Sequence, residues 1–473
     1  MNNFFLTVGI EIHTQVNTKT KMFSNTSICN DTTIENINKF VNEYDLGMPG
    51  VLPSINEEVI KKAIIFANAL EMKINKNLRF DRKNYYYQDL PKGYQITQNF
   101  FPFAIEGKIK ISNKSIGINR FHLEEDTAKQ IIDNEKIILD YNRSGIPLIE
   151  IVSEPEMHSS DEVIEYLQKI KQILTFLEIS DGEMENSSLR VDVNISVSKN
   201  NLEKGIRVEI KNLNSFSNVR DAINYEFERQ VKLINSGSHV DQETRKWDEK
   251  KRQTIFMRNK KNSIDYKYCA EPNILPIDIS NIVDNIKLDK KSLPCNIAIY
   301  LEENGLNKEM VNLLLNDYKI YKVFQYANKK INDFNLCASW ILVELTGVLK
   351  EIKIYELNEI KLNNIIDLIL LIKSQEINNK QGKVLLQEII KSDKNAKELI
   401  IELNFKQITD KNIITKELQE IINNNKELII KNKNNYEKIK KIIIGQLMKI
   451  TNGQANPVIS NQILEELLIK VLE

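Results

Sequence analysis

The chain has 473 residues, too many for one hydrophobic core, so two or three domains are expected. Its 65 basic and 65 acidic residues cancel, which excludes a global positive field for binding nucleic acid and leaves only local patches for that task. The four cysteines, Cys29, Cys269, Cys295 and Cys337, lie far apart and form no C-x-x-C pair, so neither a disulfide framework nor a cysteine zinc site is expected.

The stretch VGIEIHTQ, which begins at Val8, predicts a strand close to the N-terminus. Successive side chains of a strand point to opposite faces, so Ile10 and Ile12 share one face while Glu11 and His13 share the other. Taken alone, this pattern favours an ordinary antiparallel strand with one face in water. A strand this early leaves no room for a leader peptide. Each apolar run long enough to span a membrane is interrupted by charged residues, so no membrane span is expected. A cytoplasmic protein is expected.

The same alternation recurs in three later stretches, at residues 120–129, 188–197 and 206–215. Their polar faces carry Arg120, His122, Glu124 and Asp126 in the first stretch, Arg190, Asp192 and Asn194 in the second, and Arg207, Glu209 and Lys211 in the third. If the four strands share one sheet, its apolar face packs on helices and its other face gathers carboxylates, imidazoles and cations.

Helical periodicity interrupts the strands at residues 164–177 and 218–237, the second of which ends at Asn235-Ser236-Gly237. Strands mixed with helices, without a regular βαβ rhythm, predict an α+β domain rather than a doubly wound sheet. After about residue 295 the pattern is helical, and the polar stretch 402–412 suggests a further boundary. We therefore predict an α+β domain over residues 1–294, an all-α domain over 295–402 and a small all-α tail over 403–473.

The residue types on the shared polar face favour phosphate chemistry over an ordinary wet surface. Carboxylates in excess need cations, and arginines suit phosphates. Hard oxygen ligands with an occasional imidazole are what Mg²⁺ accepts, with phosphates and waters completing its coordination. The same groups around a polyphosphate serve phosphoryl transfer. The sequence contains no G-x-x-x-x-G-K-[ST] motif, so a nucleotide site here would not be a P-loop.

Long motifs along the chain match one known family in their order. They include VGIEIHTQVNTKTKMFS, FDRKNYYYQDLPKGYQI, HLEEDTAK, LDYNRSGIPLIEIVSEP, GEMENSSLRVDVNISV and DYKYCAEPNILPI, with GQLMKITNGQANP in the tail. In these stretches, and nearly from end to end, the chain resembles the B subunits (GatB family) of the aspartyl/glutamyl-tRNA(Asn/Gln) amidotransferase. Motifs of this length in this order are highly specific.

The resemblance implies a fold, partners and an activity. The fold would be a cradle related to glutamine synthetase, built on a mixed or antiparallel sheet, followed by an all-α domain and a tail that contacts tRNA. The assembly would be a heterotrimer in which an amidase A subunit releases ammonia from glutamine and a small C subunit joins A to B. The B subunit would use ATP and Mg²⁺ to phosphorylate the side-chain carboxylate of Glu-tRNA(Gln) or Asp-tRNA(Asn), which ammonia converts to the amide. This is a ligase activity in translation.

The resemblance also implies roles for particular residues. The motifs that line the phosphorylation site supply the expected Mg²⁺ ligands, which are Glu11, His13, Glu124, Glu125 and Asp192. The expected catalytic residues, two of which lie where ammonia reaches the site, are Glu11, His13, Lys83, Glu124 and Glu125. The residues expected to contact ATP are Arg190, Asp192, Arg207 and Lys211. Strict alternation points Glu125 away from Glu124, so a bulge or a strand end is required there if both serve.

One stretch departs from the family. Many members carry two zinc-binding cysteine pairs in the region that matches residues 22–50, whereas this chain has Ser24 and Asn25, a lone Cys29, and Asp45 in place of a pair. Zinc is therefore not expected as a cofactor, and ordinary packing is expected to hold the loop.

Two other functions fit the same residues. A metal-dependent nuclease would use the carboxylates with two metal ions to cleave RNA. A non-catalytic tRNA-binding scaffold would rely on the helical regions and leave the polar face inert. Phosphate release from ATP that depends on misacylated tRNA would identify the amidotransferase subunit, because neither the nuclease nor the scaffold is expected to show it.

Overall fold

The computed structural model describes residues 4–29, 34–133, 136–200, 203–259, 265–349, 357–392, 394–403, 405, 408, 410–426, 429, 436–451 and 454–472. The chain forms two compact units, Met1–Ile297 and Ala298–Glu473. Each unit is described by itself.

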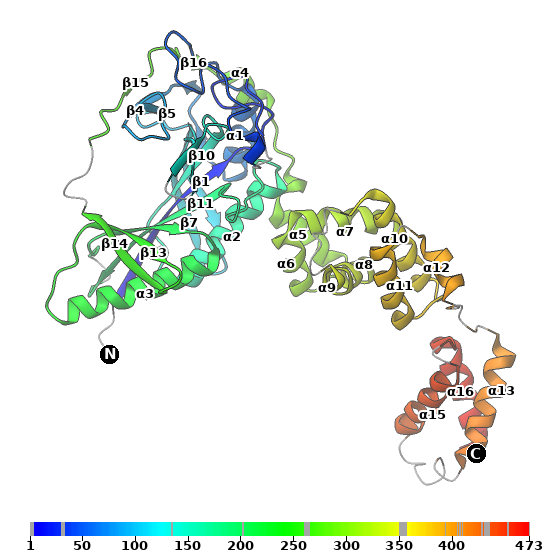
Figure 1. Cartoon of the computed structure of the whole chain (residues 1–473). Coiled ribbons are helices and arrows are strands. Elements are labelled where there is room, and N and C mark those ends of the chain that lie inside the picture. The colour runs from blue at the N-terminus through cyan, green and yellow to red at the C-terminus, as the bar shows by residue number, and fades with distance from the viewer. Residues whose placement is uncertain are drawn as a thin grey trace. The chain divides into compact units, whose positions relative to one another are not determined.

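A nine-stranded sheet organises the first unit, with the strand order β14-β13-β12-β11-β1-β10-β7-β6-β2 (Figure 1). Its strands are β1 (Phe5–Gln15), β2 (Lys73–Ile74), β6 (Ala104–Lys110), β7 (Ser115–Glu125), β10 (Pro147–Ser153), β11 (Leu189–Ser198), β12 (Val208–Leu213), β13 (Glu243–Asp248) and β14 (Gln253–Asn259). The β12–β13 pair is parallel and the other neighbouring pairs are antiparallel. The predicted α+β class is thus confirmed, whereas the likeness to a glutamine-synthetase cradle stays a prediction.

Three helices pack on the apolar face of this sheet, namely α1 (Glu57–Ala69), α2 (Ser160–Phe176) and α3 (Phe216–Asn235). Local signals set the ends of α3: Ser215 caps its start by accepting a hydrogen bond from the backbone N–H of Asn218, and Gly237 follows its end with a φ of 75°. The core holds apolar residues from both layers, such as Ile10 and Ile12 of β1. The four predicted strands therefore share one sheet, and its apolar face is the helix face.

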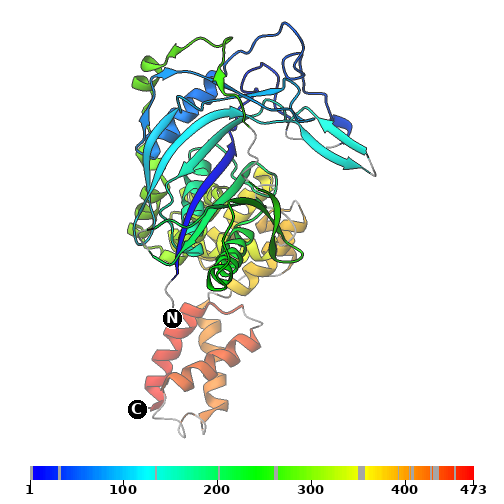
Figure 2. The ribbon, with the colours of Figure 1, turned by 90° about the vertical axis from the view of Figure 1, so that its left-hand side faces the viewer.

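Smaller elements complete the first unit. A three-stranded sheet joins β4 (Asp81–Asn84), β5 (Tyr94–Thr97) and β15 (Cys269–Ala270), and a two-stranded sheet joins β3 (Asn77–Leu78) to β16 (Ile277–Asp278). The strands β8 (Lys129–Asp133) and β9 (Lys136–Asp140) form a hairpin that extends away from the large sheet (Figure 2). Short helical turns lie at η1 (Ile34–Asn36), α4 (Ser280–Asn285) and η3 (Lys290–Ser292).

A buried ion pair holds the loop that follows β1. Lys21 Nζ lies 2.9 Å from Asp45 Oδ2, and neither side chain is exposed at all. Asp45 also accepts hydrogen bonds from Ser24 Oγ at 2.8 Å and from the backbone N–H of Asn42 at 3.1 Å. Met22, Phe23 and Tyr44 of this loop also pack into the core, so packing holds the loop together with a charged pair that was not expected.

The second unit is built of helices, with an isolated parallel β-bridge between Ile408 and Ala455. Its elements are α5 (Pro294–Glu303), which begins in the first unit, α6 (Lys308–Asn316), α7 (Tyr318–Ile331), α8 (Phe334–Ser339), the π-helix η4 (Trp340–Leu345), α9 (Thr346–Val348), α10 (Glu359–Lys373), α11 (Asn379–Lys391), α12 (Ala396–Glu402), α13 (Lys411–Asn424), α15 (Tyr436–Ile450) and α16 (Pro457–Leu472). The boundary predicted in residues 402–412 lies partly outside the described residues and stays a prediction. Across the described part of the chain, we find no helix with the length and apolarity that a membrane span requires.

The substitution Gly382→Ala is expected to lower the free energy of unfolding of the helical unit by about 1–2 kcal/mol. A Cβ atom at this position would lie 2.7 Å from Ile372 Cδ1 and 2.8 Å from Trp340 Cη2, so the indole ring must shift. Urea unfolding followed by the fluorescence of Trp340, in a Trp247→Phe background, measures the loss because the chain has only these two tryptophans.

The matched control is Gly445→Ala in α15, where a Cβ atom would meet nothing within 4 Å. There the added methyl group is expected to raise helical stability, by up to about 1 kcal/mol. Equal effects at the two glycines would contradict the packing argument.

Candidate functional site

Polar side chains gather on the sheet face opposite the helices. The antiparallel register of the central strands places Glu11 of β1 opposite Asp192 of β11, and His13 of β1 opposite Glu150 of β10. Glu150 in turn lies opposite His122 of β7. Since alternate residues of a strand face the same way, all these side chains project from one face. The four strands predicted to share a polar face do share it, and β10 joins them.

The first group of side chains, the histidine cluster, comprises His13, His122, Glu124 and Glu150. Glu150 Oε2 lies 3.2 Å from His13 Nε2 and 3.1 Å from His122 Nε2. Glu124 approaches the same two rings at 3.6 Å and 3.8 Å. The Nδ1 atom of His122 is buried and meets no hydrogen-bond partner among the described residues. One ligand atom each of His13, Glu124 and Glu150 lies within 4.8 Å of the others, as metal binding requires.

The charges of the histidine cluster depend on one another. Burial lowers the pKa of His122, but Glu150 and Glu124 outweigh burial and raise that pKa to about 9. The same balance raises the pKa of His13. Burial alone would raise the pKa of Glu150, yet the two imidazoles hold it well below its usual range. The carboxylates thus attract positive charge, which protons or a bound metal ion can supply.

The second group, the carboxylate cluster, comprises Glu11, Asp192 and Glu209, with one oxygen of each within 4.8 Å of the others. Lys211 Nζ contacts Asp192 and lies 3.2 Å from Glu209 Oε1. Burial raises the pKa of Glu11, and nearby carboxylates including Asp192 raise it further. Asn194 Nδ2 donates a hydrogen bond of 3.0 Å to Glu11. Three carboxylates against one ammonium leave a negative site of hard oxygens, the ligands that Mg²⁺ prefers.

Arg190 lies beside His13 in the register of β1 and β11. Its Nη2 atom is 3.1 Å from Asp126 Oδ2, which also accepts from Gln15 Nε2 at 3.4 Å. Its Nε atom is buried and meets no hydrogen-bond partner among the described residues. A guanidinium with a spare donor next to the histidine cluster is suited to a phosphate or carboxylate oxygen.

Lys83 lies on β4 rather than on the large sheet. Its Nζ atom lies over the ring of Tyr266, 4.8 Å from the centroid. Burial lowers the pKa of Lys83, but Tyr268 and Glu124 more than offset burial and raise that pKa above its ordinary value. The charges of Glu124 and Glu150 in the histidine cluster thus favour the charged form of Lys83.

Glu125 does not lie with the other expected metal ligands. The pairing of β7 with β10 runs without a bulge through Glu124 and Glu125, so alternation turns Glu125 to the opposite face at the end of its strand. There it is buried, and its Oε2 atom lies 2.6 Å from Lys92 Nζ. Lys92 also donates to Tyr44 Oη at 3.0 Å. The structure therefore places Glu125 in an ion pair behind the site, outside both clusters.

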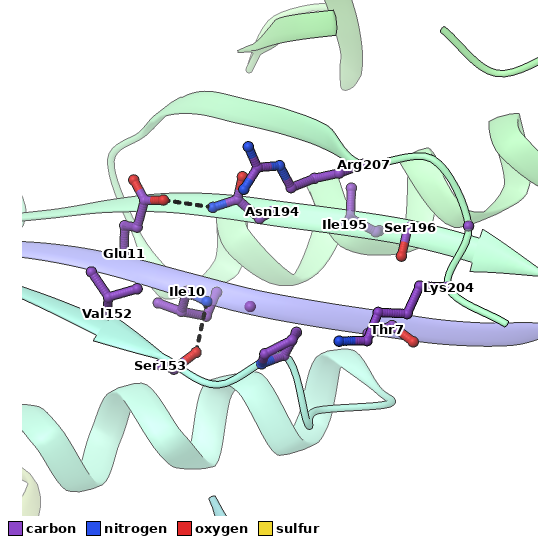
Figure 3. Close-up of a pocket in the computed structure, with 13 residues that line it drawn as sticks. Thr7, Ile10, Glu11, Val152, Ser153, Asn194, Ile195, Ser196, Lys204 and Arg207 are labelled. Carbon is purple, nitrogen blue, oxygen red and sulfur yellow. Dashed lines mark hydrogen bonds between the residues drawn. The ribbon is translucent and has the colours of Figure 1, made fainter. Parts of the chain in front are cut away.

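A cavity of about 200 Å³ opens beside the carboxylate cluster (Figure 3). Its walls include Thr7, Glu11, Ser153, Pro155, Asn194, Ser196, Lys204 and Arg207. Figure 3 shows the Arg207 side chain reaching over β11 toward Asn194 and Glu11. Asn194 Oδ1 is buried and meets no donor among the described residues. Gly9 lines the cavity without a side chain, although a Cβ atom there would make only ordinary contact with Pro155 at 3.5 Å.

The sequence alone assigns no role to Glu150 or Lys92. It predicts that His122 and Glu209 lie on the polar face but assigns them no role there. A signal for Glu150 exists, because PLIEIVS alternates one carboxylate with Ile149 and Ile151, but the preceding turn residues obscured the strand. No comparable signal exists for Lys92, which lies in a loop and meets Glu125 only in the folded chain.

Comparison with known proteins shows the family of the chain. Residues 6–284 match the family described as the GatB/GatE catalytic domain, and residues 322–468 match the GatB domain. The chain is 45% identical over 432 residues to the B subunit of the aspartyl/glutamyl-tRNA(Asn/Gln) amidotransferase of Ureaplasma urealyticum, with 89% of this chain and 90% of that protein covered. It is 42% identical over 435 residues to the protein of the same name from Mycoplasma genitalium, with 89% and 88% covered.

Proposed function

The chain belongs to the GatB/GatE family, and from that premise we propose that it is the B subunit of an amidotransferase that converts Glu-tRNA(Gln), Asp-tRNA(Asn) or both to their amides in the cytoplasm. Its own step is the ATP-dependent phosphorylation of the side-chain carboxylate. An amidase A subunit supplies the ammonia from glutamine, and a small C subunit joins the two. The observation that carries the proposal is the pair of acidic clusters on one sheet face, next to a cavity walled by Arg207 and Lys204.

Both clusters fit Mg²⁺. His13, Glu124 and Glu150 would hold one ion, and Glu11, Asp192 and Glu209 the other. The pKa of Glu11 is raised first by burial and then by neighbouring carboxylates, and a bound cation would relieve the second of these effects. Bound Mg²⁺ would neutralise phosphate charge and orient the phosphates. Glu150 takes the place among the ligands that the sequence suggested for Glu125.

The cavity fits the nucleotide. Arg207 and Lys204 place positive charge at the wall of the cavity. Glu11 lines the cavity and also belongs to the carboxylate cluster. The unsatisfied Asn194 Oδ1 atom offers an acceptor to a hydroxyl or amino group of ATP. Lys211, which contacts Asp192 and Glu209, and Arg190, which lies opposite His13 in the strand register, would bind oxygens of the transferred phosphoryl group.

The reaction itself needs activation because a carboxylate is a poor acyl donor. The substrate carboxylate attacks the γ-phosphorus of ATP, ADP leaves, and an acyl phosphate forms. Ammonia then attacks the acyl carbon, and phosphate leaves with the C–O bond electrons. Lys83 is placed to bind the substrate carboxylate electrostatically from the β4 side. The buried Lys92–Glu125 pair lies directly behind Glu124, where a carboxylate can accept the proton of arriving ammonium.

The test is phosphate release from [γ-³²P]ATP by this chain assembled with its A and C subunits. Release is expected to depend on Glu-tRNA(Gln) or Asp-tRNA(Asn). The substitution Glu11→Gln is expected to lower it by about 100- to 1,000-fold, because it removes a charge that would hold the metal ion and, through that ion, the phosphates. An unchanged circular dichroism spectrum shows that the fold is intact.

The matched control is Glu228→Gln on the exposed side of α3, which keeps full release. RNA cleavage without ATP would instead support the metal-dependent nuclease. Binding of tRNA without any ATP turnover would support the scaffold.

A further inference from the structure

Two consecutive tyrosines are exposed at the end of β4. Tyr86 is 90% exposed and Tyr87 is 52% exposed. Together with Asn84, Asp265 and Lys267 they line a hollow of about 550 Å³. The ring of Tyr86 passes over Gly93, where a Cβ atom would lie 3.1 Å from Tyr86 Cε1, so one face of the ring is supported and the rest is open. Large rings so exposed contribute little to the core, and such a patch beside a hollow indicates a ligand surface.

A series of aromatic rings links this hollow to the phosphorylation site. The ring centroids of Tyr87 and Tyr85 are 5.6 Å apart, and those of Tyr85 and Tyr266 are 5.9 Å apart. Lys83 Nζ lies 4.8 Å from the Tyr266 centroid. Burial raises the pKa of Tyr85, and the charge of Glu124 raises it further, so Tyr85 lies within electrostatic reach of the histidine cluster. Tyr85 is thus placed between the hollow and the site.

The chemistry of the proposed substrate specifies what must lie there. The reacting carboxylate is joined through a short side chain and an ester to the terminal ribose of tRNA. Ordinary bond lengths therefore keep the 3′-terminal base within about 10 Å of the reacting atoms. When the carboxylate reaches Lys83, that base must meet the protein surface next to β4. Single-stranded bases are bound chiefly by stacking on aromatic side chains.

We propose that Tyr86 and Tyr87 are positioning residues that stack on the 3′-terminal nucleotides of the misacylated tRNA. The inference rests on the proposed function and names where its substrate docks. The rim of the hollow favours RNA over an apolar protein partner, because Asn84, Asp265 and Lys267 are polar, and the last two form an exposed ion pair of 2.8 Å.

The first experiment measures the kinetics of the assembled enzyme with Glu-tRNA(Gln). Tyr86→Ala and Tyr87→Ala are each expected to raise KM for tRNA about tenfold with kcat unchanged, which is the usual effect of losing one stacking ring. Tyr86→Phe and Tyr87→Phe keep the rings and are expected to restore KM. The control is Phe256→Ala on β14, which removes a ring that is 52% exposed at the far edge of the sheet and leaves KM unchanged.

The second experiment detects stacking itself. Deacylated tRNA carrying 2-aminopurine at its 3′ end is expected to lose fluorescence when it binds the wild-type complex, and to keep its fluorescence when it binds the two alanine variants. Unchanged KM and unchanged quenching in the alanine variants would overturn the inference while leaving the proposed function intact. Loss of the A and C subunits from the purified alanine variants would also overturn it, because the tyrosines would then form a protein interface. A wild-type complex without tRNA-dependent ATP turnover would overturn the proposed function and the inference with it.

Discussion

Replacing Glu150 with glutamine is expected to lower the kcat of tRNA-dependent ATP cleavage by about 100- to 1,000-fold. Glu150 Oε2 lies within 3.2 Å of both imidazoles of the histidine cluster. The amide keeps the shape of the side chain but loses the charge, so both rings lose their closest counter-ion. The pKa of His122, about 9 in the wild-type chain, is then expected to fall, and titration of its imidazole by NMR measures that fall.

Glu154→Gln is the matched control, since it lies just after the same strand. Its carboxylate accepts a hydrogen bond from Asn119 Nδ2 at 2.7 Å and takes no part in either acidic cluster. Full ATP cleavage is expected from this variant. A Glu150→Gln enzyme with more than half the wild-type kcat would remove Glu150 from the site.

Replacing Asp45 with alanine is expected to lower the free energy of unfolding of the first unit by about 3–5 kcal/mol. The change leaves the Lys21 ammonium buried without its counter-ion and also removes the acceptor of Ser24 Oγ. Burial already lowers the pKa of Lys21 despite the charge of Asp45, so the ammonium is costly to bury even when paired. Urea unfolding at neutral pH measures the loss.

A double-mutant cycle shows whether the pair itself causes the loss. In a Lys21→Met background no charge is left unpaired, so Asp45→Ala is expected to cost at least about 2 kcal/mol less than in the wild-type chain. The surface pair Lys61–Glu57 on α1 serves as a control, and breaking it is expected to cost less than about 1 kcal/mol. Equal costs of Asp45→Ala in the two backgrounds would contradict the prediction.

The sequence predicts those features that depend on local periodicity. Alternation in β1, β7, β11 and β12 assigned the polar face, because a strand with one buried face repeats every two residues. The end of α3 at Asn235 followed from its stop signal. Strand order did not follow, since β10 lies between β1 and β7 although the chain places it after both. Glu150 was therefore absent from the expected ligands.

Contacts between distant loops could not be predicted from the sequence either. Alternation correctly turned Glu125 away from Glu124, but nothing in the sequence paired it with Lys92, 33 residues away. The absence of the family's two cysteine pairs from residues 22–50 indicates that zinc is not bound there, but it does not predict the Lys21–Asp45 pair. Lysine and aspartate are almost never fully buried unless they are paired. Such a pair becomes visible only once the folded chain brings the two residues together.

The central place of β1 has a consequence for biosynthesis. Glu11 and His13 are synthesised long before the two neighbours of β1, which are strands that end at Ser153 and Ser198. At the usual rate of about 5–20 residues per second, the nascent β1 waits roughly 10 to 35 s for its second neighbour. During that interval its unpaired edges are open to intermolecular pairing. If translation stops before β11 is made, the incomplete chain exposes the unpaired edge of β1. A chaperone would then have to cover that edge.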